Sequence, residues 1–168
     1  DGPLDSLHIG GGGFSFPRYL QQTRPGGTDV VLEIDAALVD LVEDELGLAQ
    51  NETFQVQVGD ARLALSDFTD DRFNFIVGDA FSSRAVPWHL TTREFLAEVD
   101  RVMTNDGVYV MNIIDGGSFD FARAEVATLM QIFDTEGSGS VDCADFIIKF
   151  VKVGTEERMR RKQQWRQH

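Results

Sequence analysis

Glycines and carboxylates follow the first apolar runs of the chain, at the places where a sheet would present them to a ligand. The first run ends in HIGGGGFSF, which puts Gly10, Gly11, Gly12 and Gly13 between a strand and the start of a helix. Glycines there let the backbone approach a ligand closely and adopt positive φ angles. A flexible linker is the alternative, but linkers are rarely framed by a strand and a helix. We therefore expect a ligand-binding loop.

Single carboxylates follow the next three apolar runs. VVLEID ends in Glu33, which can accept hydrogen bonds from both hydroxyls of a ribose, whereas Asp35 suits a helix cap. VQVGDAR presents Asp60, either to an adenine amino group or as the N-cap of the next helix. IVGDAF places Asp79 at the mouth of the cleft, beside the reacting end of a ligand bound across the first two loops.

Alternating strand and helix patterns predict how these residues are positioned. Strand patterns lie at residues 5–9, 28–34, 53–58, 72–77 and 107–114, and helical patterns lie between them at 15–24, 36–46, 60–66 and 91–103. Thr91 and Glu94 have the spacing of a capping box, and NDG follows as a turn signal. The pattern predicts a doubly wound, mainly parallel α/β sheet, which binds ligands beyond the carboxyl ends of its strands.

The ordered motifs IGGGGF, VLEID, VGDAR, VGDAF and VPWHLTTREFLAEVDRVMTNDGVYVMNIID resemble the spermidine synthase family of aminopropyltransferases, over about residues 4–128. The resemblance is to the branch whose bacterial members are often fused to membrane transporter segments. It implies a Rossmann-like (methyltransferase-like) sheet that binds decarboxylated S-adenosylmethionine, or S-adenosylmethionine and its thioether products. It also implies that the methionine-derived part faces the glycine loop, the ribose faces Glu33, and the adenine faces Asp60 and Ala61.

By the same resemblance, Asp79 matches the catalytic aspartate of the family. A polyamine amine must lose a proton before it attacks the carbon beside a sulfonium, and a carboxylate can hold the ammonium and take that proton. Trp88 and His89 follow on a loop that could cover the site, although His89 also fits a plain loop residue. Family members carry an N-terminal β domain and a terminal strand hairpin that the motifs do not include. We therefore expect nucleoside binding with weak or absent turnover.

A second pattern, DTEGSGSVDCAD at residues 134–145, has the spacing of a calcium-binding loop. Its candidate ligands are Asp134, Glu136, Ser138, Ser140, Asp142 and Asp145, with Gly139 at the sixth place. Apolar residues at helical spacing flank the loop, so the segment resembles an EF-hand over residues 122–153. Asp145 is shorter than the usual Glu, so we expect weak Ca²⁺ binding with Mg²⁺ competing. A metal-free hand is the alternative, and a lone hand would need the sheet, a second hand or a second copy of the chain to cover it.

These patterns predict three parts: a truncated spermidine synthase-like core at 1–117, an EF-hand-like helix–loop–helix at 118–153 that shares its first helix with the core, and a basic tail at 154–168. Residues 146–168 hold seven Lys and Arg against two Glu, a charge of +5. Because the whole chain carries −13, residues 1–145 carry −18. The acidic body would repel nucleic acid and anionic membranes. We find no pattern of a membrane span or a signal peptide, and the single cysteine cannot form an internal disulfide. The expected location is therefore cytoplasmic.

Two interpretations of function remain open from the sequence. One is a nucleoside-binding domain with a calcium-binding hand, arranged as a chimera of two unrelated modules, which acts on a polyamine if it is active. The other is a catalytically inactive calcium-binding or structural interaction protein on a Rossmann-like scaffold.

Overall fold

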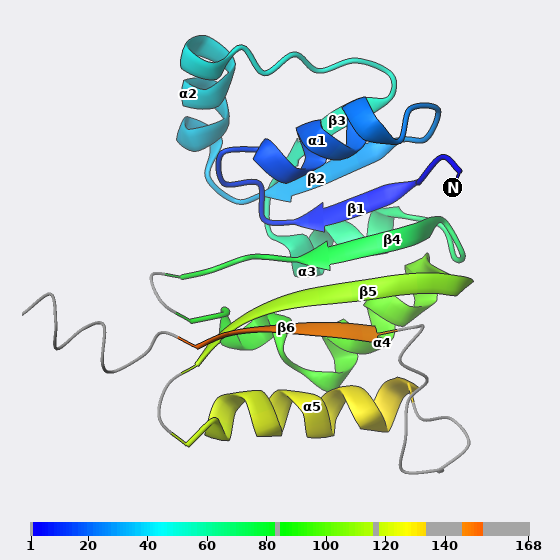
Figure 1. Ribbon diagram of the computed structural model, residues 1–168, viewed down its shortest axis with the longest axis vertical. Coiled ribbons are helices and arrows are strands. Elements are labelled where there is room, and N and C mark those ends of the chain that lie inside the picture. The colour runs from blue at the N-terminus through cyan, green and yellow to red at the C-terminus, as the bar shows by residue number, and fades with distance from the viewer. Residues whose placement is uncertain (1, 83–84, 116–117, 134–145, 153–168) are drawn as a thin grey trace, which may run out of the picture.

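The computed structural model describes residues 2–82, 85–115, 118–133 and 146–152, which form a six-stranded sheet with helices on both faces (Figure 1). The elements are β1 (Ser6–Ile9), α1 (Ser15–Thr23), β2 (Asp29–Glu33), α2 (Ala36–Leu46), β3 (Phe54–Val58), α3 (Ala61–Ala64), η1 (Leu65–Asp67), β4 (Phe73–Gly78), η2 (Trp88–Leu90), α4 (Arg93–Val102), β5 (Met103–Asp115), α5 (Asp120–Phe133) and β6 (Phe146–Lys152). The strand order is β3-β2-β1-β4-β5-β6, and every neighbouring pair is parallel. The predicted doubly wound α/β sheet is therefore confirmed.

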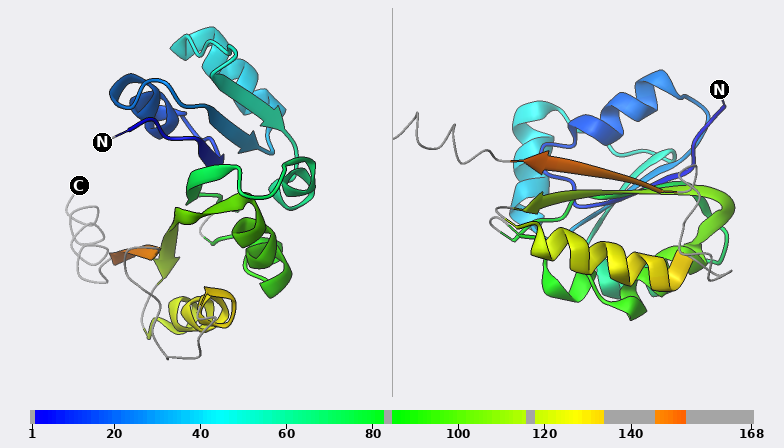
Figure 2. Two further views of the ribbon diagram at one scale, coloured as in Figure 1. Left: turned by 90° about the vertical axis from the view of Figure 1, so that its right-hand side faces the viewer. Right: turned by 60° about the horizontal axis from the view of Figure 1, so that its bottom comes forward.

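The direction of winding divides the helices between the two faces of the sheet. From β1 the chain steps outward to β2 and β3, and it then crosses back to β4 and steps the other way to β5 and β6. Right-handed crossovers consequently put α1 on one face, and α4 and α5 on the other (Figure 2). The order reverses between β1 and β4, so the crevice that binds ligands in such sheets opens beyond the ends of these two strands.

Two clusters of buried apolar side chains hold the layers together. The larger lies between the sheet and α3, α4 and α5, and it includes Leu7, Ile76, Leu96 and Met111. The smaller joins α2 to β2 and β3 through side chains such as Val39, Val42, Val31 and Phe54. Residues that alternate along β1 and β2 thus bury opposite faces, as period-2 packing requires.

All five strands expected from the sequence form, but two local details differ. The N-cap of α4 is Thr92, whose Oγ1 accepts a hydrogen bond from the Phe95 amide, whereas the capping-box spacing indicated Thr91. Thr91 instead donates to the carbonyl oxygen of Trp88. The NDG sequence does not separate α4 from the strand: it lies within β5, where the register against β4 shifts between Phe73 and Phe75.

The second helix of the expected EF-hand is not formed. Residues 146–152 are strand β6, which pairs in parallel with β5 from Tyr109↔Phe146 to Asp115↔Lys152. The segment FIIKFVK is rich in aromatic and β-branched residues, and the edge of β5 offers unpaired backbone groups. Strand pairing therefore overrides the helical spacing. The six candidate calcium ligands and the tail at 154–168 lie outside the described residues.

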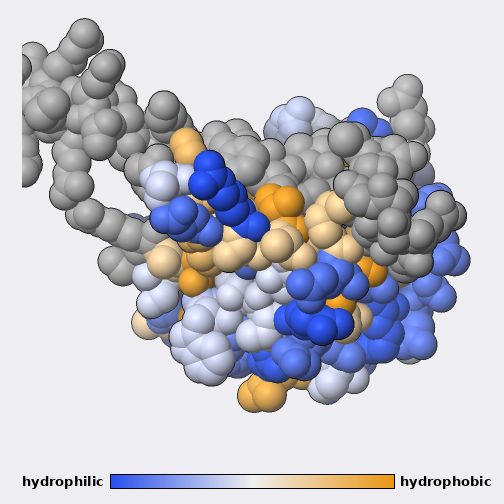
Figure 3. Space-filling view, turned by 90° about the horizontal axis from the view of Figure 1, so that it is seen from below, coloured by the Kyte–Doolittle hydropathy of each residue, from blue (hydrophilic) through white to orange (hydrophobic). Residues whose placement is uncertain are grey.

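The entering helix of that motif does form, as α5, and it is the crossover between β5 and β6. Seen from the α5 side, the surface mixes charged residues with apolar ones (Figure 3). Within the part of the chain that the structure describes, we find no helix with the length and apolar character needed to cross a membrane.

An acidic side chain is buried on the inner side of α5. Glu125 is 2% exposed and lies one turn from both Ala122 and Leu129, which belong to the main core. Its Oε1 is buried and has no hydrogen-bond partner among the described residues. Burial raises the pKa of Glu125 from its ordinary value of 4.5 to about 7. The negative charge of Glu125 also adds to burial in raising the pKa of Tyr109 on β5.

We predict that Glu125 makes the fold less stable as the pH rises. Because the pKa is raised in the folded state, stability is fully present below the pKa of the unfolded chain and is lost as the pH rises through about 7. Glu125→Gln should raise the free energy of unfolding at pH 8 by up to about 3 kcal/mol and change it little at pH 4. Denaturant titrations at both pH values test this, with the exposed Glu45→Gln as the control; equal effects of the two substitutions would contradict it.

Candidate functional site

The turn after β1 brings the ends of β1 and β4 into close contact. Gly10 has φ 99°, and a Cβ atom on it would lie 2.6 Å from the carbonyl oxygen of Asp79. The Asp79 amide donates to the carbonyl oxygen of Ile9 at 2.9 Å. Gly11 faces the buried ring of Phe14, and a Cβ atom there would lie 2.6 Å from that ring. These contacts exclude side chains at both positions, so the loop has its glycines for steric reasons.

Glu33, at the end of β2, holds the glycine loop. Its Oε2 accepts hydrogen bonds from the amides of Gly11 at 2.8 Å and Gly12 at 3.3 Å, and its Oε1 accepts one from the Asp35 amide at 3.0 Å. The side chain is only 7% exposed. A carboxylate has about four lone-pair sites. Three are in use, so Glu33 has room for about one ribose hydroxyl in this state, and two would require the loop to release an amide.

Two further carboxylates cap helices. Asp35 accepts from the amides of Ala37 and Leu38 at the start of α2, as expected. Asp60 Oδ1 accepts from the Arg62 amide at 2.8 Å, which makes Asp60 the N-cap of α3. The other oxygen of Asp60 lies 3.5 Å from Nε2 of His89. The sequence left the two roles of Asp60 open, and the structure shows the capping role while leaving Oδ2 at the pocket.

Asp79 follows β4 and is exposed. Its Oδ1 accepts a hydrogen bond from Asn112 Nδ2 on β5 at 2.7 Å, which leaves Oδ2 without a hydrogen bond among the described residues. Backbone contacts to β1 and a side-chain contact to β5 thus fix this carboxylate from both neighbouring strands. Asn112 does not stand out in the sequence, because its contact with Asp79 depends on the lateral order of the strands.

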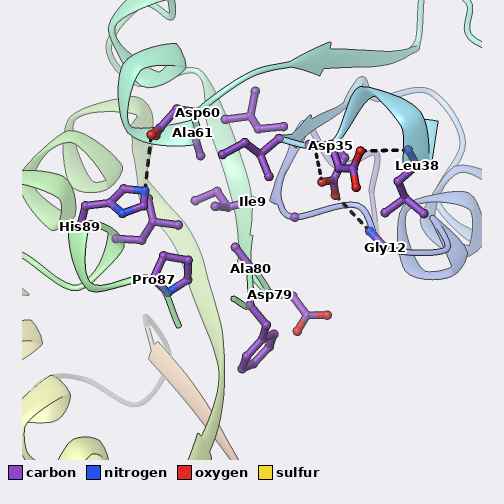
Figure 4. A pocket seen from close by; sticks show the side chains of 16 residues that line it. Ile9, Gly12, Asp35, Leu38, Asp60, Ala61, Asp79, Ala80, Pro87 and His89 are labelled. Carbon is purple, nitrogen blue, oxygen red and sulfur yellow. Dashed lines mark hydrogen bonds and ion pairs between the residues drawn. The ribbon is translucent and has the colours of Figure 1, made fainter. Parts of the chain in front are cut away.

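One cavity of about 460 Å³ brings most of these residues together at the switch point (Figure 4). Its walls include the candidate residues Gly10, Gly12, Glu33, Asp60, Ala61 and Asp79. Gly11 is not part of the wall but bonds to Glu33. Pro87 and His89 complete one side, with His89 contributed by η2. The volume suits a small organic ligand.

The charge of the pocket selects against anions. Glu33, Asp35, Asp60 and Asp79 contribute four carboxyl groups to its wall, and no Lys or Arg is found among the described residues that line it. Such a wall attracts cations and repels phosphate. The described residues contain no cluster of three or more His, Cys, Asp or Glu side chains that could hold a metal ion.

A serine, a histidine and an aspartate also meet at the start of β1 and β2, but not as a nucleophilic site. Ser6 Oγ donates to Asp29 Oδ1 at 2.5 Å and lies 2.8 Å from His8 Nε2. The serine is therefore in the middle of the chain of hydrogen bonds, where a histidine would be needed to accept its proton. All three side chains are buried, so the cluster is structural.

No family model matches the chain. Over 112 residues it is 33% identical to the polyamine aminopropyltransferase of Vibrio vulnificus, an alignment that covers 66% of this chain and 38% of that protein. Over 147 residues it is 27% identical to the probable polyamine aminopropyl transferase of Bifidobacterium longum, covering 86% of this chain and 32% of that protein. The chain thus spans less than half the length of these curated relatives.

Solved structures show the same fold. A probable spermidine synthase from Corynebacterium glutamicum matches with a TM-score of 0.73 and 30% identity, over 79% of this chain and 47% of that one. Human methyltransferase-like protein 13, solved in complex with SAH, matches with a TM-score of 0.70 and 20% identity, over 79% of this chain and 64% of that one. The chain therefore has a spermidine synthase-like, methyltransferase-like fold.

We predict that Glu33→Ala loosens the glycine loop. Removing the carboxylate leaves the amides of Gly11 and Gly12 without their acceptor, so their hydrogen exchange should accelerate about tenfold, equivalent to one net hydrogen bond. Exchange measured by NMR tests this. Glu45→Ala on α2 removes the same charge away from the loop and should leave both rates unchanged; unchanged rates in Glu33→Ala would show that the loop is ordered by other contacts.

Proposed function

We propose that this chain binds an adenosyl thioether or sulfonium, such as decarboxylated S-adenosylmethionine or S-adenosylmethionine, at the switch point of its sheet. The observation that carries the proposal is the single cavity into which β1, β2, β3 and β4 all deliver the residues that follow them. Its acidic wall fits a cationic sulfonium and does not fit a nucleotide phosphate. The names of the relatives, polyamine aminopropyltransferase and spermidine synthase, support the same ligand class.

The proposed ligand would lie across the pocket with its parts against separate residues. Glu33 accepts a ribose hydroxyl at the lone-pair site that the loop amides leave open. Asp60 Oδ2 accepts from the adenine amino group, beside the buried Ala61. Gly10, Gly11 and Gly12 border the methionine-derived part, where the absence of side chains leaves space for it. This arrangement sets the reactive carbon near Asp79.

We propose Asp79 as the general base of aminopropyl transfer to a polyamine. In that reaction the ammonium group of the polyamine passes a proton to the Asp79 carboxylate. The lone pair of the resulting amine nitrogen then forms a bond to the carbon beside the sulfonium, and the electrons of the breaking carbon–sulfur bond leave with the sulfur as the neutral thioether. Asn112 holds Oδ1, which leaves Oδ2 to hold the ammonium and take the proton. Because the sulfonium is already a good leaving group, positioning supplies most of the remaining rate.

The calcium-binding hypothesis for residues 134–145 stays a prediction. Its candidate ligands lie outside the described residues, and β6 replaces the second helix that a hand uses to clamp its loop. A covering partner, a second hand or a homodimer, was expected only for such a hand. The residues therefore support nucleoside binding more directly than they support a calcium response.

Titration calorimetry with 5′-methylthioadenosine tests the nucleoside site. We expect the parent chain to bind, and Glu33→Ala to bind at least tenfold more weakly, because it loses both a ligand acceptor and the ordered loop. Asp79→Asn should keep the nucleoside affinity within about twofold and abolish any transfer from decarboxylated S-adenosylmethionine to putrescine. No heat of binding in the parent chain would refute the nucleoside site. Aminopropyl transfer by Asp79→Asn would refute Asp79 as the general base.

A thermal scan with and without millimolar CaCl₂ tests the calcium loop. If the loop binds metal in the native state alone, the melting temperature should rise with calcium, by linkage. Asp134→Ala should abolish the rise, and Asp145→Glu should enlarge it by restoring the second carboxylate oxygen. The absence of a rise in both the parent chain and Asp145→Glu would end the hypothesis.

A further inference from the structure

An arginine joins two segments, distant in the sequence, that build one end of the pocket. Arg62, on α3, donates from Nη1 to the carbonyl oxygen of His89 at 2.8 Å and to Thr92 Oγ1 at 2.6 Å. Thr92 is the N-cap of α4, and His89 belongs to η2. Arg62 therefore fixes the position of the η2 backbone relative to the start of α3.

His89 faces Asp60 Oδ2, the oxygen that would accept a hydrogen bond from the adenine of the proposed ligand. Its Nε2 lies 3.5 Å from Asp60 Oδ2, and the two side chains are 28% and 33% exposed. Figure 4 shows them pointing toward each other along the pocket wall. Because Oδ1 caps α3, Oδ2 is the oxygen left to a ligand. A separation of 3.5 Å is long for a hydrogen bond, so Oδ2 keeps capacity for a second donor.

We propose that His89, held in place by Arg62, is a specificity-determining residue that keeps Asp60 Oδ2 turned toward the nucleobase of the ligand. This rests on the proposed nucleoside site. With its proton on Nε2, the imidazole turns a polar N–H toward Oδ2 at 3.5 Å, and this electrostatic contact restrains a carboxyl group that is otherwise one-third exposed. A base with an exocyclic amine then donates to the same oxygen. A base with a carbonyl at that place brings two acceptors together and leaves both unpaired, which polar sites reject strongly.

The alternative is that the ring only fills space, and two substitutions separate these roles. His89→Phe keeps an aromatic ring without a donor, and His89→Gln keeps a donor without the ring. The probes are 5′-methylthioadenosine and 5′-methylthioinosine, which differ in having an amine or a carbonyl on the base. Calorimetry on the parent chain should show at least a tenfold preference for the amine.

In His89→Phe this preference should fall by about threefold to tenfold, the value of one net hydrogen bond, and His89→Gln should restore it to within about twofold of the parent chain. The opposite pattern, with Phe like the parent chain and Gln impaired, would overturn the proposal. A parent chain that binds neither nucleoside would instead refute the proposed function itself. Binding without any preference between the two probes would overturn the role of His89 and the proposed contact of Asp60 with the adenine amine, and would leave the nucleoside site itself standing.

Arg62 and Arg101 provide a matched pair for the positioning step. Arg101 also joins separate segments, with its guanidinium donating to the carbonyl oxygens of Leu65 and Phe68. Neither Leu65 nor Phe68 lines the pocket, whereas His89, which Arg62 holds, does. Arg62→Gln should lower the preference for the amine, and combining it with His89→Phe should lower it no further, since both act through one contact. Arg101→Gln should lower the melting temperature and leave the preference unchanged. An equal loss of preference in both arginine variants would overturn the coupling.

Discussion

The close approach of the carboxyl ends of β1 and β4 is the constraint on which the candidate site depends. The backbone of Gly10 lies against the carbonyl oxygen of Asp79, and the Asp79 amide is bonded to Ile9, so the two strand ends are held together just before the chain turns away on either side. α1 lies on one face of the sheet, and α4 lies on the other. The crevice opens because these directions diverge, and Asp79 is at its mouth because its own backbone forms the contact.

The carboxylates around this crevice organise the backbone and also face the cavity. Glu33 orders the glycine loop, while Asp35 and Asp60 cap α2 and α3. Each therefore has a fixed orientation before any ligand arrives, which reduces the cost of ordering the site on binding. These backbone hydrogen bonds also limit how many bonds a ligand can receive. Glu33 has about one lone-pair site left, and Asp60 offers one oxygen, beside His89. Ligand binding and the local order of the loops are consequently coupled.

The segment at 146–152 shows where local pattern and tertiary context disagree. Its apolar residues fit the spacing of a helix after a calcium loop, yet the residue types also favour a strand. The sheet decides between helix and strand, because the edge of β5 pairs with β6 over the whole length of β6. A helix there would leave that edge open, and the intrinsic preference of a short segment is too small to compete with a row of backbone hydrogen bonds. The helical prediction for α5 held because a crossover helix suits both interpretations.

The sequence by itself determined the order and type of the first nine major elements, from β1 to β5, and the candidate residues that follow the strands. These features depend on alternation, capping and glycine placement, which are local properties of a chain. Only the tertiary structure decided which strands are neighbours, and with it the contacts of Asn112 with Asp79, of Arg62 with the η2 backbone, and of His89 with Asp60. Residues about 30 positions apart met there because parallel crossovers return distant strand ends to one edge of the sheet, a relation that no local pattern encodes.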